Sequence, residues 1–199
     1  MRVLAFSDGL FAIAMTLLVV GITVPVLQQG DSVDELADAI NDLSGSLVSF
    51  VISFLVIGRY WLAHHEFFSR LKAVDSKLIA INLFYLMFVA FLPFPTALLG
   101  NYFENPLAVT IYAVSVAAIS GMEVVEYRHA HKNDLMAMRL PDDVYRWGAF
   151  LSLAPVFLFI ASIPLAFVHT WIAVASWYLF VPFFKVVQRW QPARTNEFF

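Results

Sequence analysis

The sequence predicts an all-α integral membrane protein with six transmembrane helices per subunit. Three observations predict this class: an apolar composition, six long apolar stretches, and a one-sided distribution of Lys and Arg. Of the 199 residues, 61% are hydrophobic and only 14% are charged, whereas an ordinary soluble domain has roughly 45 to 50% and 25%. A soluble fold of this length cannot bury so much apolar surface, and its twenty Phe would leave large exposed patches.

Six stretches of the chain are long and apolar enough to cross a bilayer, which takes roughly 20 mainly apolar residues. We place these helices at 3–24, 45–68, 77–99, 106–127, 144–163 and 167–187. The uncharged stretch 147–184 is about twice as long as one crossing, so we expect two helices joined by a tight turn near Pro164. Pro93 and Pro95 predict a kink in the third helix, because proline frees backbone carbonyls.

Residues 1–190 are expected to form one membrane domain, and residues 191–199 a short cytoplasmic tail. The chain has no Cys, so neither a disulfide nor a thiolate metal site is available. A cleaved signal peptide is a poor alternative for the first stretch. Asp8 interrupts its start, and no small-residue cleavage site follows Pro25.

The basic residues predict the orientation, because Lys and Arg accumulate on the cytoplasmic side of a membrane. They lie before the first helix, around the second and fourth connections and after the sixth helix: Arg2; Arg70, Lys72 and Lys77; Arg128, Lys132, Arg139 and Arg146; Lys185, Arg189 and Arg194. The opposite connections carry only acidic charges: Asp31, Asp34, Glu35, Asp38, Asp42 and Glu104. Both termini are therefore predicted to be cytoplasmic. The acidic run 31–42 either concentrates cations at an outer mouth or is a solvated loop.

The first helix carries a motif that is unusual inside a membrane: Arg2, three residues, then Phe6, Ser7 and Asp8. This motif resembles the Arg-x-x-x-Phe-Ser-Asp signature of the transmembrane protein 175 family, which comprises lysosomal potassium channels and their single-repeat prokaryotic relatives. Further similarity lies in helices two and three, at Trp61, His64, His65, Asn82 and the segment 91–96. Helices four to six match the family only in number and hydrophobicity.

The resemblance implies a potassium-permeable cation channel, in which helix one of each six-helix subunit lines the central pore of a homotetramer. In the family an isoleucine ring forms the narrowest point, and the matching residue is Ile13. Thr16 matches a pore-facing threonine layer that is implicated in ion selectivity. The remaining matches are associated with a structural network between helices: Arg2, Phe6, Ser7, Asp8, Trp61, His64, His65 and Asn82.

Helical geometry separates the implied pore face from the signature. Each residue of a helix advances about 100°, so Ile13, Thr16, Leu17 and Val20 share one stripe, while Asp8 lies roughly 140° from Ile13. We predict that Ile13, Leu17 and Val20 form the pore constriction and gate, because a narrow apolar ring excludes water and ions. Two alternatives stay open. The apolar residues of the stripe can pack against other helices, and Thr16 can bond its own backbone.

Asp8 needs a partner, since an Asp at the centre of a membrane helix costs roughly 2.5 to 3.5 kcal/mol. It lies six residues from Arg2, about 9 Å along a helix. Candidate partners are Ser7, Arg59, Trp61, His65 and Asn82. Trp61 and His65 are four residues apart and share a helix face, which favours His65 over His64. This cluster either only holds the helices together or also serves gating or proton sensing.

Three polar residues near the inner end of helix four recur at intervals of three: Glu123, Glu126 and His129. With His131 they have the chemistry to bind a divalent metal. The alternative, which we favour, is a solvated helix end paired with Arg128 and Lys132, with no metal. The sequence contains no HExxH motif, nucleophile elbow or phosphate loop, so we expect no enzyme and no cofactor other than permeant potassium ions.

The Thr-Val-Gly-Tyr-Gly filter is also missing, so any potassium preference must come from pore side chains. The main rival function is a proton-coupled secondary transporter, because intramembrane Asp and His also couple proton movement. The absence of internal repeats and the small number of helices oppose it. Eukaryotic relatives carry two six-helix repeats, so this single repeat is expected in the plasma membrane of a prokaryote.

Overall fold

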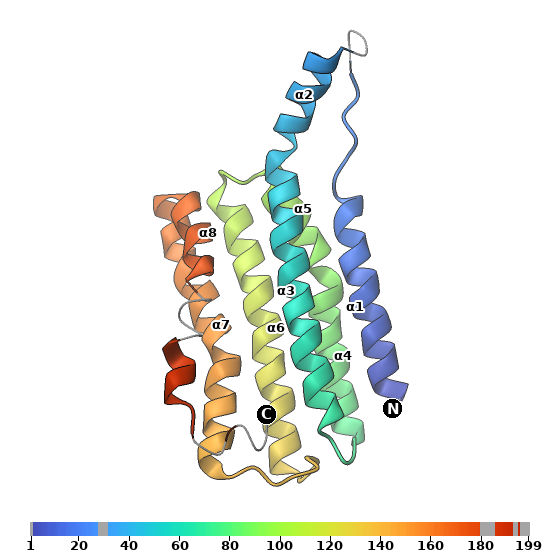
Figure 1. Cartoon of the computed structure of the whole chain (residues 1–199), viewed down its shortest axis with the longest axis vertical. Coiled ribbons are helices and arrows are strands. Elements are labelled where there is room, and N and C mark those ends of the chain that lie inside the picture. The colour runs from blue at the N-terminus through green and yellow to red at the C-terminus, as the bar shows by residue number, and fades with distance from the viewer. Residues whose placement is uncertain (1, 28–31, 180–185, 193–194, 196–199) are drawn as a thin grey trace.

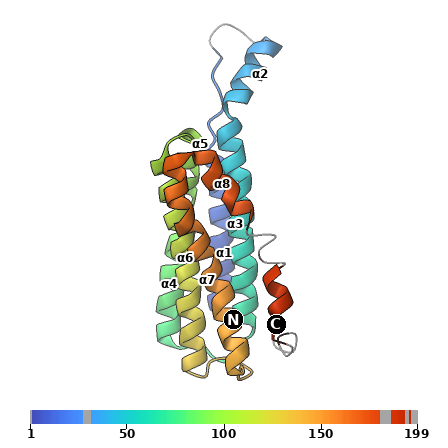
Figure 2. The ribbon, with the colours of Figure 1, turned by 90° about the vertical axis from the view of Figure 1, so that its left-hand side faces the viewer.

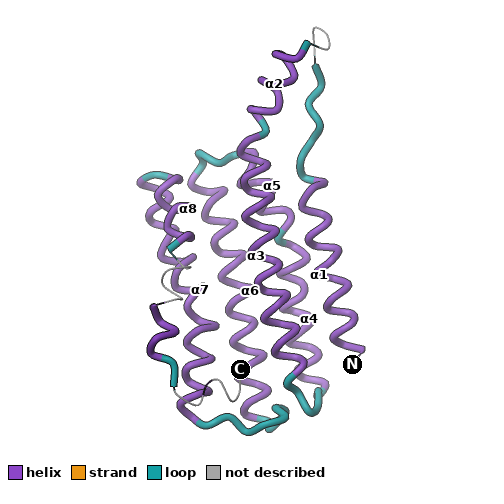
Figure 3. The backbone as a smooth tube through the Cα atoms, viewed as in Figure 1, coloured by secondary structure: helices purple, strands orange, loops and turns teal. Residues whose placement is uncertain are grey.

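The structure, a computed structural model, describes residues 2–27, 32–179, 186–192 and 195. In these ranges the chain is an elongated bundle of helices (Figure 1). The elements are α1 (Arg2–Val20), α2 (Val33–Asp42), α3 (Ser44–Ser69), α4 (Ser76–Phe91), α5 (Pro93–Asn101), α6 (Pro106–Lys132), α7 (Asp142–Val168), α8 (Thr170–Tyr178) and the short 3-10 helix η1 (Gln188–Trp190). The connections gather at the two ends of the bundle (Figure 3).

Five helical segments of the described chain are long and apolar enough to cross a membrane: α1, α3, α4 with α5, α6, and α7. They match the first five predicted spans and confirm an all-α membrane protein. α4 ends at Phe91 and α5 begins at Pro93, so the helix is interrupted at Leu92, beside the two prolines that predict a kink. The sixth predicted span, 167–187, includes α8 but also residues 180–185, which lie outside the described residues.

The turn predicted near Pro164 lies instead at His169. α7 continues through Pro155 and Pro164 to Val168, because neighbouring helices support a membrane helix whose backbone carbonyls proline has freed. His169 is in an extended conformation, and its Nδ1 accepts from the backbone N–H of Trp171 at 3.3 Å. This cap starts α8, which packs against α7.

Two other segments of the structure are helical where the sequence did not predict a helix. α6 runs to Lys132, five residues past the expected end, because a helix can continue into water beyond the apolar layer. Residues 33–42, predicted as part of an acidic loop, form α2. The side chain of Ser32 caps α2 by accepting from the N–H of Glu35 at 3.2 Å. Asp34 and Glu35 lie in its first turn, where negative charge complements the helix dipole.

The α3–α4 and α6–α7 connections meet at one end of the bundle. The backbone N–H of Lys72 donates to Leu135 O at 2.9 Å, that of Ala137 donates to Arg70 O at 2.8 Å, and Lys72 Nζ lies 2.6 Å from Asp134 Oδ2. The start of α1 lies at the same end (Figure 1). We call it the basic end. The opposite end, from which α2 projects (Figure 2), carries Asp34, Glu35, Asp38, Asp42 and Glu104 and, among the described residues, no Lys or Arg; we call it the acidic end.

Small residues let α3 and α5 approach closely near the acidic end. A Cβ atom on Gly100 would lie 2.7 Å from Ser46 Cα and 2.6 Å from Ser49 Oγ, and one on Gly45 would lie 2.8 Å from Gly100 O. Close backbone contact of this kind is typical of helix pairs in membranes. It fixes α3 against the span to which α4 and α5 belong, and α1 packs on the same elements.

Candidate functional site

α1 lies at the edge of the bundle, packed against α3, α4 and α5 (Figure 1). One face of this helix is buried, through Ser7, Phe11, Ala14 and Leu18. Its other faces point away from the core of the same chain. A membrane helix in this position has one anchored side and one side free to meet lipid, water or another copy.

The predicted stripe lies on the unburied side of α1. Ile13 is 60% exposed, Leu17 45% and Val20 72%, and Thr16 is exposed beside them. Packing inside the same chain therefore does not account for the stripe. The hydroxyl of Thr16 donates to Ile13 O at 2.8 Å, as the backbone-bonding alternative predicted. Its oxygen keeps lone pairs that can face an ion or water.

A buried chain of hydrogen bonds joins α1 to α3 and α4. Nε2 of His64 donates to Oδ1 of Asn82 at 2.8 Å, and Nδ2 of Asn82 donates to Oγ of Ser7 at 3.1 Å. Ser7 in turn donates to Val3 O at 3.0 Å. The exposed fractions of Ser7, His64 and Asn82 are 2% or less. Nδ1 of His64 is buried without a hydrogen-bond partner among the described residues. The bonds from His64 to Asn82 and from Asn82 to Ser7 nevertheless link three helices and stabilise one arrangement of them.

A second connection lies nearer the surface. Nε1 of Trp61 donates to Oδ1 of Asp8 at 2.9 Å, and Nδ1 of His65 lies 3.8 Å from the same oxygen. The side chain of Asp8 is 36% exposed and that of His65 is 51% exposed. Asp8 therefore has the partner that its place in a membrane helix requires. Ser7, Asn82 and Arg59, the other predicted candidates, do not form hydrogen bonds or ion pairs with it within the described chain.

Three signature residues differ from the expectation. His64, not His65, is the buried member of the network, because its ring stacks between Phe68 and Tyr85, with centroids at 4.4 and 5.3 Å. The spacing from Trp61 correctly brings His65 to Asp8, so the two adjacent histidines serve different connections. Arg2 makes no hydrogen bond or ion pair with other described residues. Phe6 is 57% exposed, and since it precedes Ile13 by seven residues it shares the face of the stripe rather than that of the network.

The three polar residues of α6 do not converge. Glu126 is buried, Glu123 lines a cavity, and His129 reaches another helix. Throughout the part of the chain that the structure describes, no group of three or more His, Cys, Asp or Glu is arranged to hold a metal ion. The predicted pairing of this helix end with Arg128 and Lys132 is not seen among the described contacts.

His129 instead ties the end of α6 to the start of α4. Its Nε2 lies 2.9 Å from Asp75 Oδ2, and Asp75 Oδ1 accepts from the backbone N–H of Leu78 at 2.6 Å. The hydrogen bond from Leu78, followed by that from His129, lowers the pKa of Asp75 below its ordinary value of 3.8. Asp75 therefore caps α4 as a carboxylate at neutral pH.

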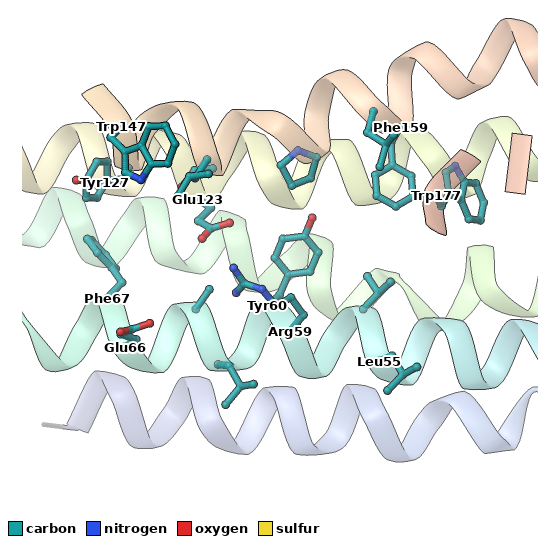
Figure 4. Close-up of a pocket in the computed structure, with 18 of the residues that line it drawn as sticks. Leu55, Arg59, Tyr60, Glu66, Phe67, Glu123, Tyr127, Trp147, Phe159 and Trp177 are labelled. Carbon is teal, nitrogen blue, oxygen red and sulfur yellow. The ribbon is translucent and has the colours of Figure 1, made fainter. Parts of the chain in front are cut away.

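Sequence reasoning missed a cavity of about 750 Å³ between α3, α6 and α7, on the side of α3 opposite α1 (Figure 4). Arg59 and Glu123 face it, along with several aromatic side chains. Apolar residues look alike in sequence whether they contact a helix or a cavity. The available signal was the position of Arg59 and Glu123 inside two apolar spans, which is costly unless each charge has a task.

The sequence and the fold match known proteins. A family model described as endosomal/lysosomal potassium channel TMEM175 matches residues 2–93, which include α1, α3, α4 and all residues of both connections to α1. A potassium channel of Streptomyces collinus is 42% identical over 123 residues, or 60% of this chain and 58% of that protein. A potassium channel of Chamaesiphon minutus is 32% identical over 196 residues, or 93% of each chain.

The crystal structure described as a lysosomal potassium-selective channel TMEM175 homolog from Chamaesiphon minutus has the same fold. It superposes with a TM-score of 0.74 at 32% identity and covers 93% of this chain and 95% of that one. The similarity thus extends through α6 and α7, beyond the segment that the family model matches.

Proposed function

Because the chain belongs to the TMEM175 family, we propose that it is the subunit of a potassium-permeable cation channel whose pore is lined by α1. The family consists of ion channels, not enzymes. The observation that carries the proposal is the division of α1 into two faces. The network that contains Ser7 anchors one face, and the other presents an apolar stripe outside the chain's own core.

A single stripe cannot enclose an ion path, so the pore requires several copies of α1 around an axis. Closed rings of identical subunits are the usual way to build such an axis. The resemblance implies four copies. In this homotetramer Ile13, Leu17 and Val20 form the constriction and gate, since a ring of apolar side chains dewets and stops ions. Thr16 supplies the oxygens that favour potassium in the absence of a carbonyl filter.

The signature residues serve as the anchor of the pore helix. Ser7, His64 and Asn82 hold α1 against α3 and α4, while Asp8 is held by Trp61 and His65. Rotation of α1 would break both connections, so they fix which side chains face the axis. Arg2 lies at the basic end, where it contributes to orientation rather than to either connection.

The basic end faces the cytoplasm, because the described Lys and Arg of the connections gather there. The proposed topology has six spans, the sixth including α8, in a membrane domain of residues 1–190 with both termini cytoplasmic. The relatives from Streptomyces and Chamaesiphon are prokaryotic. This supports a location in the plasma membrane of a prokaryote.

The test is recording from the purified full-length protein in planar bilayers with a potassium gradient. A channel gives unitary currents far above transporter turnover, with a reversal potential that follows the potassium gradient. Saturating, proton-coupled uptake without unitary events would contradict the proposal and favour a secondary transporter. Mass photometry of the same preparation should give the mass of four chains, and a monomer would contradict the shared pore.

A further inference from the structure

The cavity behind α3 is large enough for a ligand. Its volume of about 750 Å³ lies within the range of roughly 300 to 1,000 Å³ that is typical of ligand pockets. α3 forms one wall, α7 the facing wall, and α6 contributes Glu123 and Tyr127 at the back (Figure 4). α3 separates it from α1, so the cavity is not part of the proposed ion path (Figure 4).

Four charged side chains line the cavity. Glu66 and Arg70 pair with each other near the basic end, and the other two carry opposite charges deeper in the membrane. Arg59 of α3 and Glu123 of α6 both point into it (Figure 4). Within the described chain, neither side chain makes a hydrogen bond or an ion pair within 4.0 Å, with the other or with a third residue. Charges at this depth are costly and are normally paired. A ligand that brings one negative and one positive group would satisfy both without moving the helices.

Between Arg59 and the acidic end, the walls of the cavity are mainly apolar. Toward the acidic end the cavity is lined by Val51, Leu55, Phe159 and Trp177. Val51 precedes Arg59 by eight residues, about 12 Å along α3. One leaflet of the hydrocarbon core is about 15 Å thick, half of the full core. The apolar part of the cavity therefore suits one acyl chain of a lipid whose head lies beside Arg59.

We propose that the cavity binds a zwitterionic phospholipid, with its phosphate at Arg59, its ammonium group at Glu123 and an acyl chain along Leu55 and Phe159. A guanidinium group matches phosphate through paired N–H donors. An anionic lipid lacks the group that Glu123 requires, and a cationic amphiphile is repelled by Arg59. Binding at this site does not depend on whether the protein conducts ions.

The test is native mass spectrometry of the purified full-length protein after incubation with equal amounts of phosphatidylethanolamine and phosphatidylglycerol. The wild type should retain phosphatidylethanolamine at least about fivefold better, the ratio expected when a hydrogen bond worth about 1 kcal/mol is lost. Arg59→Gln should abolish this preference. Glu123→Gln should reverse it, because Arg59 then attracts the lipid that has no ammonium group.

The matched control is Arg128→Gln, which removes an exposed charge from the same end of α6 outside the cavity and should leave the preference unchanged. Glu123→Gln is expected to gain a preference for phosphatidylglycerol, and misfolding would not produce such a gain. Equal retention of both lipids by the wild type, an unchanged ratio in Arg59→Gln, or an unchanged ratio in Glu123→Gln would overturn the proposal. So would an assembly that retains no lipid, the result expected if another copy of the chain fills the cavity.

Discussion

Asn82 in α4 donates from Nδ2 to Oγ of Ser7 in α1 across 3.1 Å, in a site where both residues are at most 1% exposed. This contact fixes the rotation of α1 about its own axis, because Ser7 lies on the face opposite the exposed stripe. His64 bonds to the other end of the same amide. One amide side chain therefore joins three helices.

Replacing this amide should weaken the fold. Asn82→Ala leaves Ser7 and His64 buried without their partner, which costs roughly 1 to 3 kcal/mol. The measurement is unfolding of the purified protein in detergent by a graded denaturant. Asn101→Ala is the control, because Asn101 is exposed and its side chain, among the described residues, bonds only to Ala97 O of its own helix. Equal stability of the two variants would contradict a structural role for Asn82.

The close contact between α3 and α5 predicts that alanine at Gly100 lowers stability, the reverse of its usual effect in a helix. Gly→Ala in an exposed helix interior normally stabilises by about 1 kcal/mol. Gly100→Ala should instead destabilise, since its Cβ would lie 2.7 Å from the backbone at Ser46. Gly121→Ala is the comparison, because a Cβ there meets nothing within 4 Å. If thermal unfolding in detergent shows both variants stabilised alike, the helices do not approach as described.

Thr16 should contribute to ion selectivity. Thr16→Val keeps the shape of the side chain and removes the hydroxyl, a loss of about 1 kcal/mol per ion contact or roughly fivefold in the potassium-to-sodium permeability ratio. The ratio is measured from reversal potentials under mixed salts. Thr110→Val is the control, since Thr110 also bonds its own backbone but lies in α6. An unchanged ratio in Thr16→Val would remove Thr16 from the selectivity site.

The cap at Asp75 predicts a defined dependence of stability on pH. Because its pKa in the fold lies below the ordinary value of 3.8, its stabilising effect is fully present above that value and is lost as pH falls through the lowered pKa. Asp75→Asn keeps a capping side chain but removes this titration. The difference in unfolding temperature between wild type and variant should therefore shrink as the pH falls from 5 to below about pH 4. A difference that stays the same down to about pH 2 would contradict this assignment.

Apolar length located the five spans that the structure describes, because membrane helices must satisfy their backbone internally and therefore appear as long apolar runs. The position of the turn at His169 did not follow from this signal, since the residues on both sides of it are apolar. Helical spacing placed Ile13 and Val20 on one exposed face. The resemblance associated Phe6 with the structural network, although its interval of seven residues from Ile13 places it on the exposed face.

The partners in the network were only partly predictable. The intramembrane Asp8 required a donor, and Trp61 supplies it. The choice between His64 and His65 depended on the rotation of α3, which spacing within one helix does not determine. Likewise, Arg59 and Glu123 signalled an unusual polar site, but the cavity between them arises from how far apart α3 and α7 lie.

The central claim, that the exposed stripe of α1 lines the ion path, is tested most directly by single-channel recording of Ile13→Asn beside Val19→Asn. Both replace an exposed apolar residue of α1 with the same amide, but Val19, which is 54% exposed, lies about 120° away from Ile13. Ile13→Asn should wet the constriction and raise the potassium current severalfold, while Val19→Asn should conduct like the wild type. An unchanged current in Ile13→Asn, or an equal rise in both variants, would contradict the assignment of the pore to this face.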